Sequence, residues 1–280
     1  MVFERWYPVE YIKHNPLMGF LLGMSYTLFA MVIALFTFPQ DPALVTVGLV
    51  SLLLLPSLGK FSEIERFLES KDDDVRIQNA FTFNKDFYIT YTAIFFGIFF
   101  TFAAFSIALP SLAASKLFQP QLAIIGHAFT FSSGQFLSIL SNNAIVLLAC
   151  FFISLIAGNG SIFLITWNAS VWGTIFGTIA RGATENLQGN VLIIFPLIII
   201  SVFPHVLLEI SSYIVATISG TVISDSLILD GPKNPVFYRV LGYNLILLAI
   251  ALVLLLVGGL VETYVLQNFK VYKMITMFAK

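Results

Sequence analysis

The amino-acid sequence predicts an all-α membrane protein, a polytopic transmembrane helix bundle in which residues 1–280 form a single domain. We expect about six full spans and a broken or re-entrant helical hairpin at Pro204. Composition supports this prediction, because 58% of the residues are hydrophobic and only 10% are charged, whereas about a quarter of the residues of a soluble globular protein are charged. Apolar runs also recur that are long enough for the roughly 20 helical residues needed to cross a bilayer.

The same composition excludes several classes of function. A formal net charge of −1 leaves no clustered basic surface of the kind that binds nucleic acid, so the expected partner is the lipid bilayer. The single cysteine, Cys150, cannot form an internal disulfide and lies in an apolar run. No phosphate-binding loop and no G-x-S-x-G nucleophile motif occurs. We therefore expect no cofactor and no catalytic residue.

Six apolar runs are the predicted full spans. The first is too long for a signal-peptide core and no small-residue cleavage site follows it, so we interpret it as an uncleaved span. Two prolines and an aspartate in residues 38–43 favour a tight turn, which makes the first two spans a helical hairpin. The predicted spans are residues 17–38, 43–58, 88–109, 143–157, 161–180 and 241–264.

Two segments between the spans are different in character. Residues 60–86 mix five basic with seven acidic residues and are predicted to form a polar cytoplasmic loop that begins as a continuation of the second span or as an interfacial helix. A solvated charged segment is the simpler interpretation, and docking of a cytoplasmic partner is the alternative. Residues 111–142 are expected to form an interfacial or amphipathic segment, and whether residues 121–140 enter the membrane stays open.

The apolar stretch around Pro204 has an unusual length. Residues 191–203 would form a helix of about 20 Å, too short to cross comfortably, whereas residues 205–224 are long enough to cross once. One helix over both would be about 50 Å long, so a hairpin is favoured. The hairpin would bring both termini to the side of residues 60–86, together with ten of the 14 lysines and arginines. The positive-inside tendency then predicts that both termini are cytoplasmic in the cell membrane.

Several polar residues stand inside these apolar runs. His205 and Glu209 are four residues apart and share one helix face. Because ionisable groups are costly in lipid, we expect both to point into the bundle, where the amides of Asn142, Asn143 and Asn168 form a buried polar cluster with them. Asn142 or Asn143 is equally compatible with a helix cap. The His205–Glu209 pair is interpreted either as a structural polar staple or as a site of transport or chemistry.

Small residues suggest where helices approach each other. Gly173 and Gly177 form a G-x-x-x-G pattern, which allows a neighbouring helix to pack closely. We assign Gly173, Gly177 and Gly220 to packing and Pro204 to a helix break.

The text "FLSILSNNAIVLLACFFISLIAGNGSIFLITWNASVWG" followed by "PHVLLEISSYIVATISG" resembles the stage II sporulation protein M family of bacteria and archaea. The resemblance covers about residues 136–220, and the beginning of the chain is more loosely similar to archaeal members. Val206 departs from the family pattern, in which a glycine is expected after the histidine. The family pattern falls on Asn142, Asn143, Asn168, Pro204, His205, Glu209 and Gly220.

The resemblance implies an integral membrane subunit that works with partner proteins, and in non-sporulating organisms a general scaffold or translocation role. Our first hypothesis is therefore a non-catalytic membrane scaffold or permease-like subunit, with a homo-oligomer or partner membrane proteins. The second is a proton- or ion-coupled transporter that uses Glu209 and His205. An intramembrane metalloenzyme is disfavoured, because zinc usually takes three protein ligands and only His14 and His127 remain as further histidines.

Overall fold

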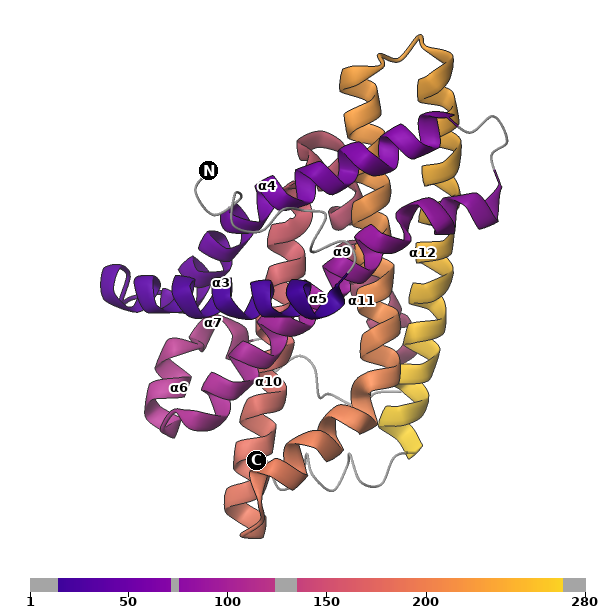
Figure 1. The fold of residues 1–280 in the computed structure, drawn as a ribbon. Coiled ribbons are helices and arrows are strands. Elements are labelled where there is room, and N and C mark those ends of the chain that lie inside the picture. Colours follow the sequence, from indigo (N-terminus) through magenta and orange to yellow (C-terminus); the bar gives the residue numbers. More distant parts are fainter. Residues whose placement is uncertain (1–14, 72–75, 124–134, 269–280) are drawn as a thin grey trace.

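The computed structural model describes residues 15–71, 76–123 and 135–268, and within these ranges the chain is helical without any strand. The predicted all-α fold is confirmed (Figure 1). The elements are α3 (Pro16–Thr37), α4 (Pro42–Lys71), α5 (Ile77–Ala108), α6 (Ser111–Leu117), α7 (Gln119–Leu122), α9 (Gln135–Ala157), the 3₁₀ helix η1 (Gly158–Ser161), α10 (Ile162–Leu187), α11 (Val191–Leu229) and α12 (Pro235–Asn268).

Six helical stretches of the described chain are long and apolar enough to cross a membrane. They correspond to α3, α4, α5, the stretch Phe136–Leu187, α11 and α12. The stretch Phe136–Leu187 contains two α-helices, because η1 separates α9 from α10. The prediction of a multi-pass membrane protein is therefore confirmed.

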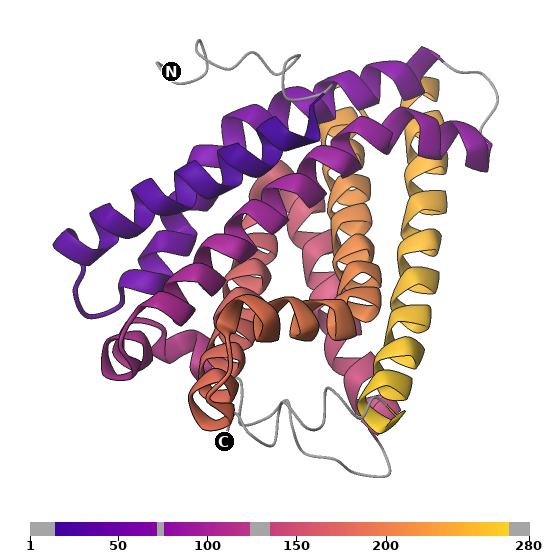
Figure 2. The same ribbon diagram turned by 60° about the horizontal axis from the view of Figure 1, so that its bottom comes forward.

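The helices form two groups that are inclined to each other. Figure 2 shows α3, α4 and α5 running obliquely across the group formed by α9, α10, α11 and α12. Within this arrangement α12 packs along α11, α9 packs on α11, and both α3 and α10 pack on α5. Helix α11 is therefore central to its own group, and most of the packing between the two groups is that of α5 against α10.

One end of the bundle collects the polar parts of four helices. The end of α4, the beginning of α5 and the connection from α11 to α12 lie at this end, whereas the α3–α4 and α10–α11 connections lie away from it (Figures 1 and 2). We call the end formed by residues 60–71, 77–86 and 225–239 the polar end.

Residues 60–86, expected to be a polar loop, are mostly helical. Residues 60–71 continue α4 and residues 77–86 begin α5, while residues 72–75 lie outside the described residues. Pro56 lies inside α4 without ending it. At 30 residues, α4 is about 45 Å long, more than a hydrocarbon core requires. The polar ends of α4 and α5 therefore extend beyond an apolar layer of ordinary thickness.

The segment expected to be interfacial is divided among several elements. Residues 111–117 form α6 and residues 119–122 form α7, while α9 begins at residue 135. Residues 124–134 lie outside the described residues. The interfacial position expected for residues 111–142 stays a prediction.

The hairpin predicted at Pro204 is not present. Helix α11 is continuous over 39 residues and contains both Pro196 and Pro204. A proline inside a helix removes one backbone hydrogen bond and bends the helix without necessarily ending it. Accordingly, the first part of α11 runs in a different direction from the remainder (Figure 2). The expectation that both termini lie on one side depended on the hairpin and loses its basis with it.

Close helix contacts occur at the glycines assigned to packing. A Cβ atom at Gly173 would overlap the carbonyl oxygen of Phe99, and one at Gly177 would be 2.6 Å from the carbonyl oxygen of Ala103, so α10 packs against the backbone of α5. Gly220 of α11 has the same relationship with α9, where a Cβ atom would overlap the Phe151 carbonyl oxygen.

Candidate functional site

The structure separates the predicted polar cluster into parts. His205 is buried and Glu209 is half-buried on α11, whereas Asn142 is exposed and Asn143 half-buried on α9. Both asparagines lie well inside α9, which begins at Gln135, so neither is its N-cap. Asn168 donates a hydrogen bond of 2.8 Å to the Leu164 carbonyl of its own helix.

None of the three asparagine side chains forms a hydrogen bond with His205 or Glu209 in the described part of the chain. The Nδ1 atom of His205 is buried and has no hydrogen-bond partner among the described residues. The predicted cluster is thus brought together only on α11, where His205 precedes Glu209 by about one helical turn.

Glu209 has partners that differ from the expected amides. The Tyr213 hydroxyl, one turn later on α11, donates a hydrogen bond of 2.7 Å to Glu209 Oε1. Glu262 of α12 lies close enough to interact electrostatically with Glu209. Gly258 allows this approach, because a Cβ atom there would be only 3.3 Å from Leu208 Cβ and 3.5 Å from the Glu209 backbone nitrogen. Carboxyl groups from α11 and α12 therefore lie within electrostatic range of each other at this level of the bundle.

Another carboxyl group, at the polar end of the bundle, is fully buried. Glu69 of α4 has no exposed surface. The side-chain amide of Asn84 donates to its Oε1 at 2.8 Å, and that of Asn244 donates to its Oε2 at 2.6 Å. Removing a carboxylate from water is costly unless hydrogen-bond donors replace the water. The two asparagines supply these donors, and Glu69 thereby joins α4 to α5 and α12.

Helix α11 is attached to the same group through the backbone of α12. Ser219 donates a hydrogen bond of 2.7 Å to the carbonyl oxygen of Asn244. The side-chain Oδ1 atoms of Asn84 and Asn244 are both buried and accept no hydrogen bond from the described residues. We call Glu69, Asn84 and Asn244 the carboxylate–amide cluster.

An ion pair joins the same two regions further toward the surface. Arg66 of α4 donates to both carboxylate oxygens of Asp230 at 3.0 Å, and Ser226 donates to Asp230 Oδ2 at 2.8 Å. Ser62 also donates a short hydrogen bond to Asp225. The end of α4 is therefore fixed to the end of α11 by charged groups as well as by the carboxylate–amide cluster.

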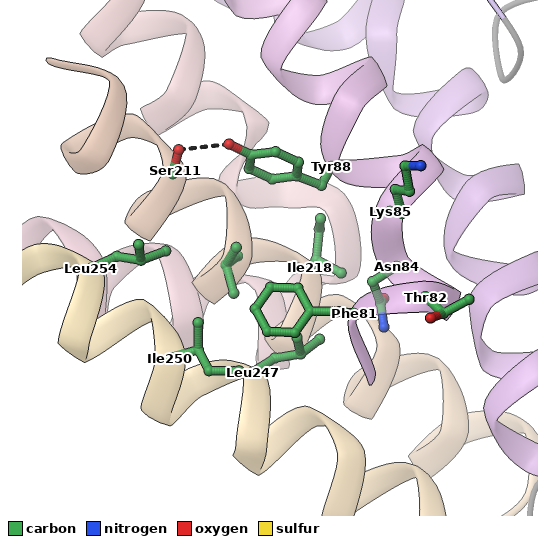
Figure 3. Close-up of a pocket in the computed structure, with 11 residues that line it drawn as sticks. Phe81, Thr82, Asn84, Lys85, Tyr88, Ser211, Ile218, Leu247, Ile250 and Leu254 are labelled. Atoms are coloured by element: carbon green, nitrogen blue, oxygen red, sulfur yellow. Dashed lines mark hydrogen bonds between the residues drawn. The ribbon is translucent and has the colours of Figure 1, made fainter. Parts of the chain in front are cut away.

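A cavity of about 390 Å³ lies between α5, α11 and α12 (Figure 3). On one side, the Tyr88 hydroxyl and Ser211 Oγ are 2.7 Å apart. Because Ser211 itself donates to the Leu207 carbonyl, Tyr88 is the donor of that pair. The lining residues are Phe81, Thr82, Asn84, Lys85, Tyr88, Ser211, Val215, Ile218, Leu247, Ile250 and Leu254.

Sequence reasoning did not single out the residues that form these contacts. Asn244 and Glu262 stand in the apolar run of the last span. Like Asn168 and Glu209, they are polar residues inside an apolar run, and this pattern indicates them equally. Glu69 lies in the charged stretch, where nothing in the local pattern separates a buried carboxylate from a solvated one. Asn84 precedes the predicted third span.

The described residues contain no group of three or more histidine, cysteine, aspartate and glutamate side chains placed to hold a metal ion. His14 and His127, the other histidines considered as metal ligands, lie outside the described residues.

Apolar helices of membrane-spanning length, packed through glycines and joined by buried polar side chains, define a multi-pass α-helical integral membrane protein. Residues 92–266 match the family model described as Stage II sporulation protein M. The chain therefore belongs to the stage II sporulation protein M family, and the resemblance recognised over residues 136–220 is confirmed. The match includes Glu209, Asn244 and Glu262 but begins after Glu69 and Asn84. No curated protein and no solved structure matches the chain.

Proposed function

We propose that the protein is a non-catalytic, permease-like membrane subunit in which α5, α11 and α12 surround a cavity within the membrane. The cavity is the observation that supports this function. Its volume of about 390 Å³ falls within the range of roughly 300–1,000 Å³ of small-molecule sites.

The surrounding contacts support the same function. The carboxylate–amide cluster holds α5 and α12 together at the polar end, and Asn84 belongs both to this cluster and to the cavity wall. The three helices are thus fixed to one another at one end of the cavity. We retain the expectation that such a subunit works as a homo-oligomer or with partner membrane proteins.

Accessibility of a cavity cysteine tests this function. Cys150 is the only cysteine of the sequence and is buried, so Cys150→Ser provides the background. Ser211→Cys introduces a thiol of similar shape in the cavity, and Leu252→Cys introduces one on the exposed face of α12. In lipid nanodiscs without anionic lipid, a small membrane-impermeant methanethiosulfonate should modify Ser211→Cys and leave Leu252→Cys unmodified. If neither reacts, the cavity is closed to water and a scaffold is favoured.

A second candidate function, proton- or ion-coupled transport through Glu209, is favoured by the electrostatic interaction with Glu262 of α12. A structural staple would pair Glu209 with a donor from the neighbouring helix, whereas α12 brings a second carboxyl group. Two carboxylates close together in a medium of low dielectric repel each other unless they share a proton or bind a cation. His205, one turn before Glu209, would supply a further proton-binding group.

This second function has its own test. Proteoliposomes containing a pH-sensitive dye should show proton uptake when a membrane potential is imposed, and Glu209→Gln should reduce the rate at least tenfold. Asn168→Ala, which changes a mid-span polar residue bonded within its own helix, serves as the matched control and should leave the rate unchanged. Identical rates in all three proteins would exclude proton transport through Glu209.

The distribution of basic residues supports an orientation in the cell membrane. Among the described residues, Lys60, Arg66, Lys71, Arg76, Lys85, Lys233 and Arg239 lie in segments at the polar end, and Lys116 and Arg181 lie elsewhere. By the positive-inside tendency, the polar end is cytoplasmic. With α9 and α10 each crossing once, α3 begins on the cytoplasmic side and α12 ends on the opposite side. This orientation replaces the expected placement of both termini in the cytoplasm.

A further inference from the structure

We propose that the cavity between α5, α11 and α12 binds one acyl chain of an anionic phospholipid whose phosphate pairs with Lys85. This inference rests on the proposed function, because it names the class of ligand that the same cavity would take. It depends on the chemistry of the lining, the free charge at the edge, and the direction in which polarity changes along the cavity.

The lining is mainly hydrocarbon. Six apolar side chains contribute to it, and Figure 3 shows Phe81 of α5 on the side of Leu247 and Ile250 of α12. The hydrogen bonds of two polar lining groups are already used, since Tyr88 is bonded to Ser211 and the amide nitrogen of Asn84 to Glu69. A ligand of this cavity is therefore recognised mainly through apolar contact, which favours a hydrocarbon chain over a polar solute. The six apolar residues are Phe81, Val215, Ile218, Leu247, Ile250 and Leu254.

The cavity carries a positive charge at its edge. Lys85 is exposed, as are its neighbours Phe81 and Thr82, so the cavity opens beside these three residues. In the described part of the chain Lys85 has neither a salt bridge nor a side-chain hydrogen bond. An ammonium group near a membrane surface attracts anionic lipid headgroups. A headgroup with a net negative charge therefore complements Lys85 better than a zwitterionic or neutral headgroup does.

Polarity decreases with distance from the polar end. Lys85 is about 12 Å along α5 from the beginning of that helix, whereas Leu254 is about 28 Å along α12 from its beginning. Both helices begin at the polar end (Figure 2). A molecule with its charge at Lys85 and its apolar part toward Leu254 has the orientation of a phospholipid in the leaflet on the side of the polar end. Phe81, the exposed lining residue beside the opening, is apolar, so the opening suits contact with the hydrocarbon of the bilayer.

The test uses phosphatidylglycerol that carries a photoreactive diazirine on one acyl chain, reconstituted with the full-length protein in nanodiscs. Irradiation followed by peptide mass spectrometry should place the cross-links on residues 211–218 and 247–254. Ile250→Trp fills part of the cavity and should reduce these cross-links at least tenfold. Leu252→Trp introduces the same large side chain on the exposed face of α12 and should leave the cross-links unchanged. It is the control for a general effect of side-chain size.

The charge is tested separately with a variant that does not alter the cavity. Lys85→Gln should reduce the preference for diazirine phosphatidylglycerol over diazirine phosphatidylcholine about fivefold, the factor expected for one lysine near an anionic surface. Lys116→Gln, which changes an exposed lysine on α6, should leave the preference unchanged. Equal labelling by both lipids in the unaltered protein would overturn recognition of an anionic phospholipid headgroup, as would equally efficient labelling by a diazirine fatty acid.

Cross-links spread evenly over lipid-facing residues and insensitive to Ile250→Trp would overturn the proposal as a whole. This result is distinguishable from failure of the proposed function, because photolabelling does not require water in the cavity. If Ser211→Cys reacts with the methanethiosulfonate and cavity cross-links are absent, only the lipid proposal fails. If the cross-links are present and Ser211→Cys never reacts, only the permease-like function fails.

Discussion

Glu69 of α4 and Asn244 of α12 are 175 residues apart in the sequence, and the Asn244 side-chain amide donates a hydrogen bond of 2.6 Å to the Glu69 carboxylate. Asn84 of α5 donates to the other carboxylate oxygen. Because Glu69 is fully buried, these two amides replace the water that would otherwise solvate it. The polar end of the bundle is therefore held by a carboxylate that depends on its donors.

Asn244→Ala should lower the free energy of unfolding by about 1–3 kcal/mol, because it removes a hydrogen bond and leaves a buried oxygen of the Glu69 carboxyl group, whose pKa burial raises to about 8, without a donor. Unfolding in mixed micelles of increasing SDS content, followed by circular dichroism, measures this loss. Asn168→Ala is the matched control. Asn168 donates only to the Leu164 carbonyl of its own helix, so its loss should be about 1 kcal/mol or less. Equal losses would show that Glu69 does not depend on Asn244.

The sequence predicted the spans well and the polar contacts poorly, for a physical reason. A span is a local property, since a run such as residues 17–38 is apolar and long enough by itself. The partner of Glu69 is not local, because it depends on α12 returning to α4 after the whole bundle has formed. Asn168 shows that a polar residue inside a span does not always have a partner on another helix. Its side-chain amide donates a hydrogen bond within its own helix.

Pro204 marks another limit of the sequence. Proline is compatible both with the first turn of a new helix and with a bend inside an existing one. A helix of about 50 Å is longer than the bilayer core when its whole length crosses in one direction. In α11 the first part runs in a different direction from the rest (Figure 2), so the full length of the helix does not have to cross.

Gly173→Ala and Gly48→Ala should have opposite effects on stability. A Cβ atom at Gly173 would overlap the Phe99 carbonyl oxygen of α5, and a helix backbone cannot yield easily, so we expect a loss of about 1–3 kcal/mol. Gly48 of α4 has nothing within 4 Å of the added atom, so Gly48→Ala should gain about 0.5–1 kcal/mol from helix propensity. The same SDS titration measures both variants. Loss of stability at both positions would mean that helix packing at Gly173 is not the cause.

The proposed orientation predicts opposite labelling at two helix ends. In the Cys150→Ser background, Lys71→Cys at the end of α4 and Asn268→Cys at the end of α12 both place a thiol at an exposed position. A membrane-impermeant maleimide should label Asn268→Cys in intact cells and Lys71→Cys only in inverted vesicles. If both thiols are labelled only in inverted vesicles, both helix ends are cytoplasmic, and the chain crosses the membrane an even number of times between Lys71 and Asn268. That result would contradict the proposed orientation.

Glu262→Gln should leave the protein as stable as before or raise the free energy of unfolding by on the order of 1 kcal/mol at low ionic strength, because it removes one of two interacting carboxylates. Tyr213→Phe is the comparison, since the Tyr213 hydroxyl donates to Glu209, and its removal should cost about 1.5–3 kcal/mol. Both are measured by SDS titration at the same ionic strength. If Glu262→Gln destabilises the bundle as much as Tyr213→Phe, Glu262 stabilises α12 against α11 as a structural staple, and ion coupling through this pair loses its support.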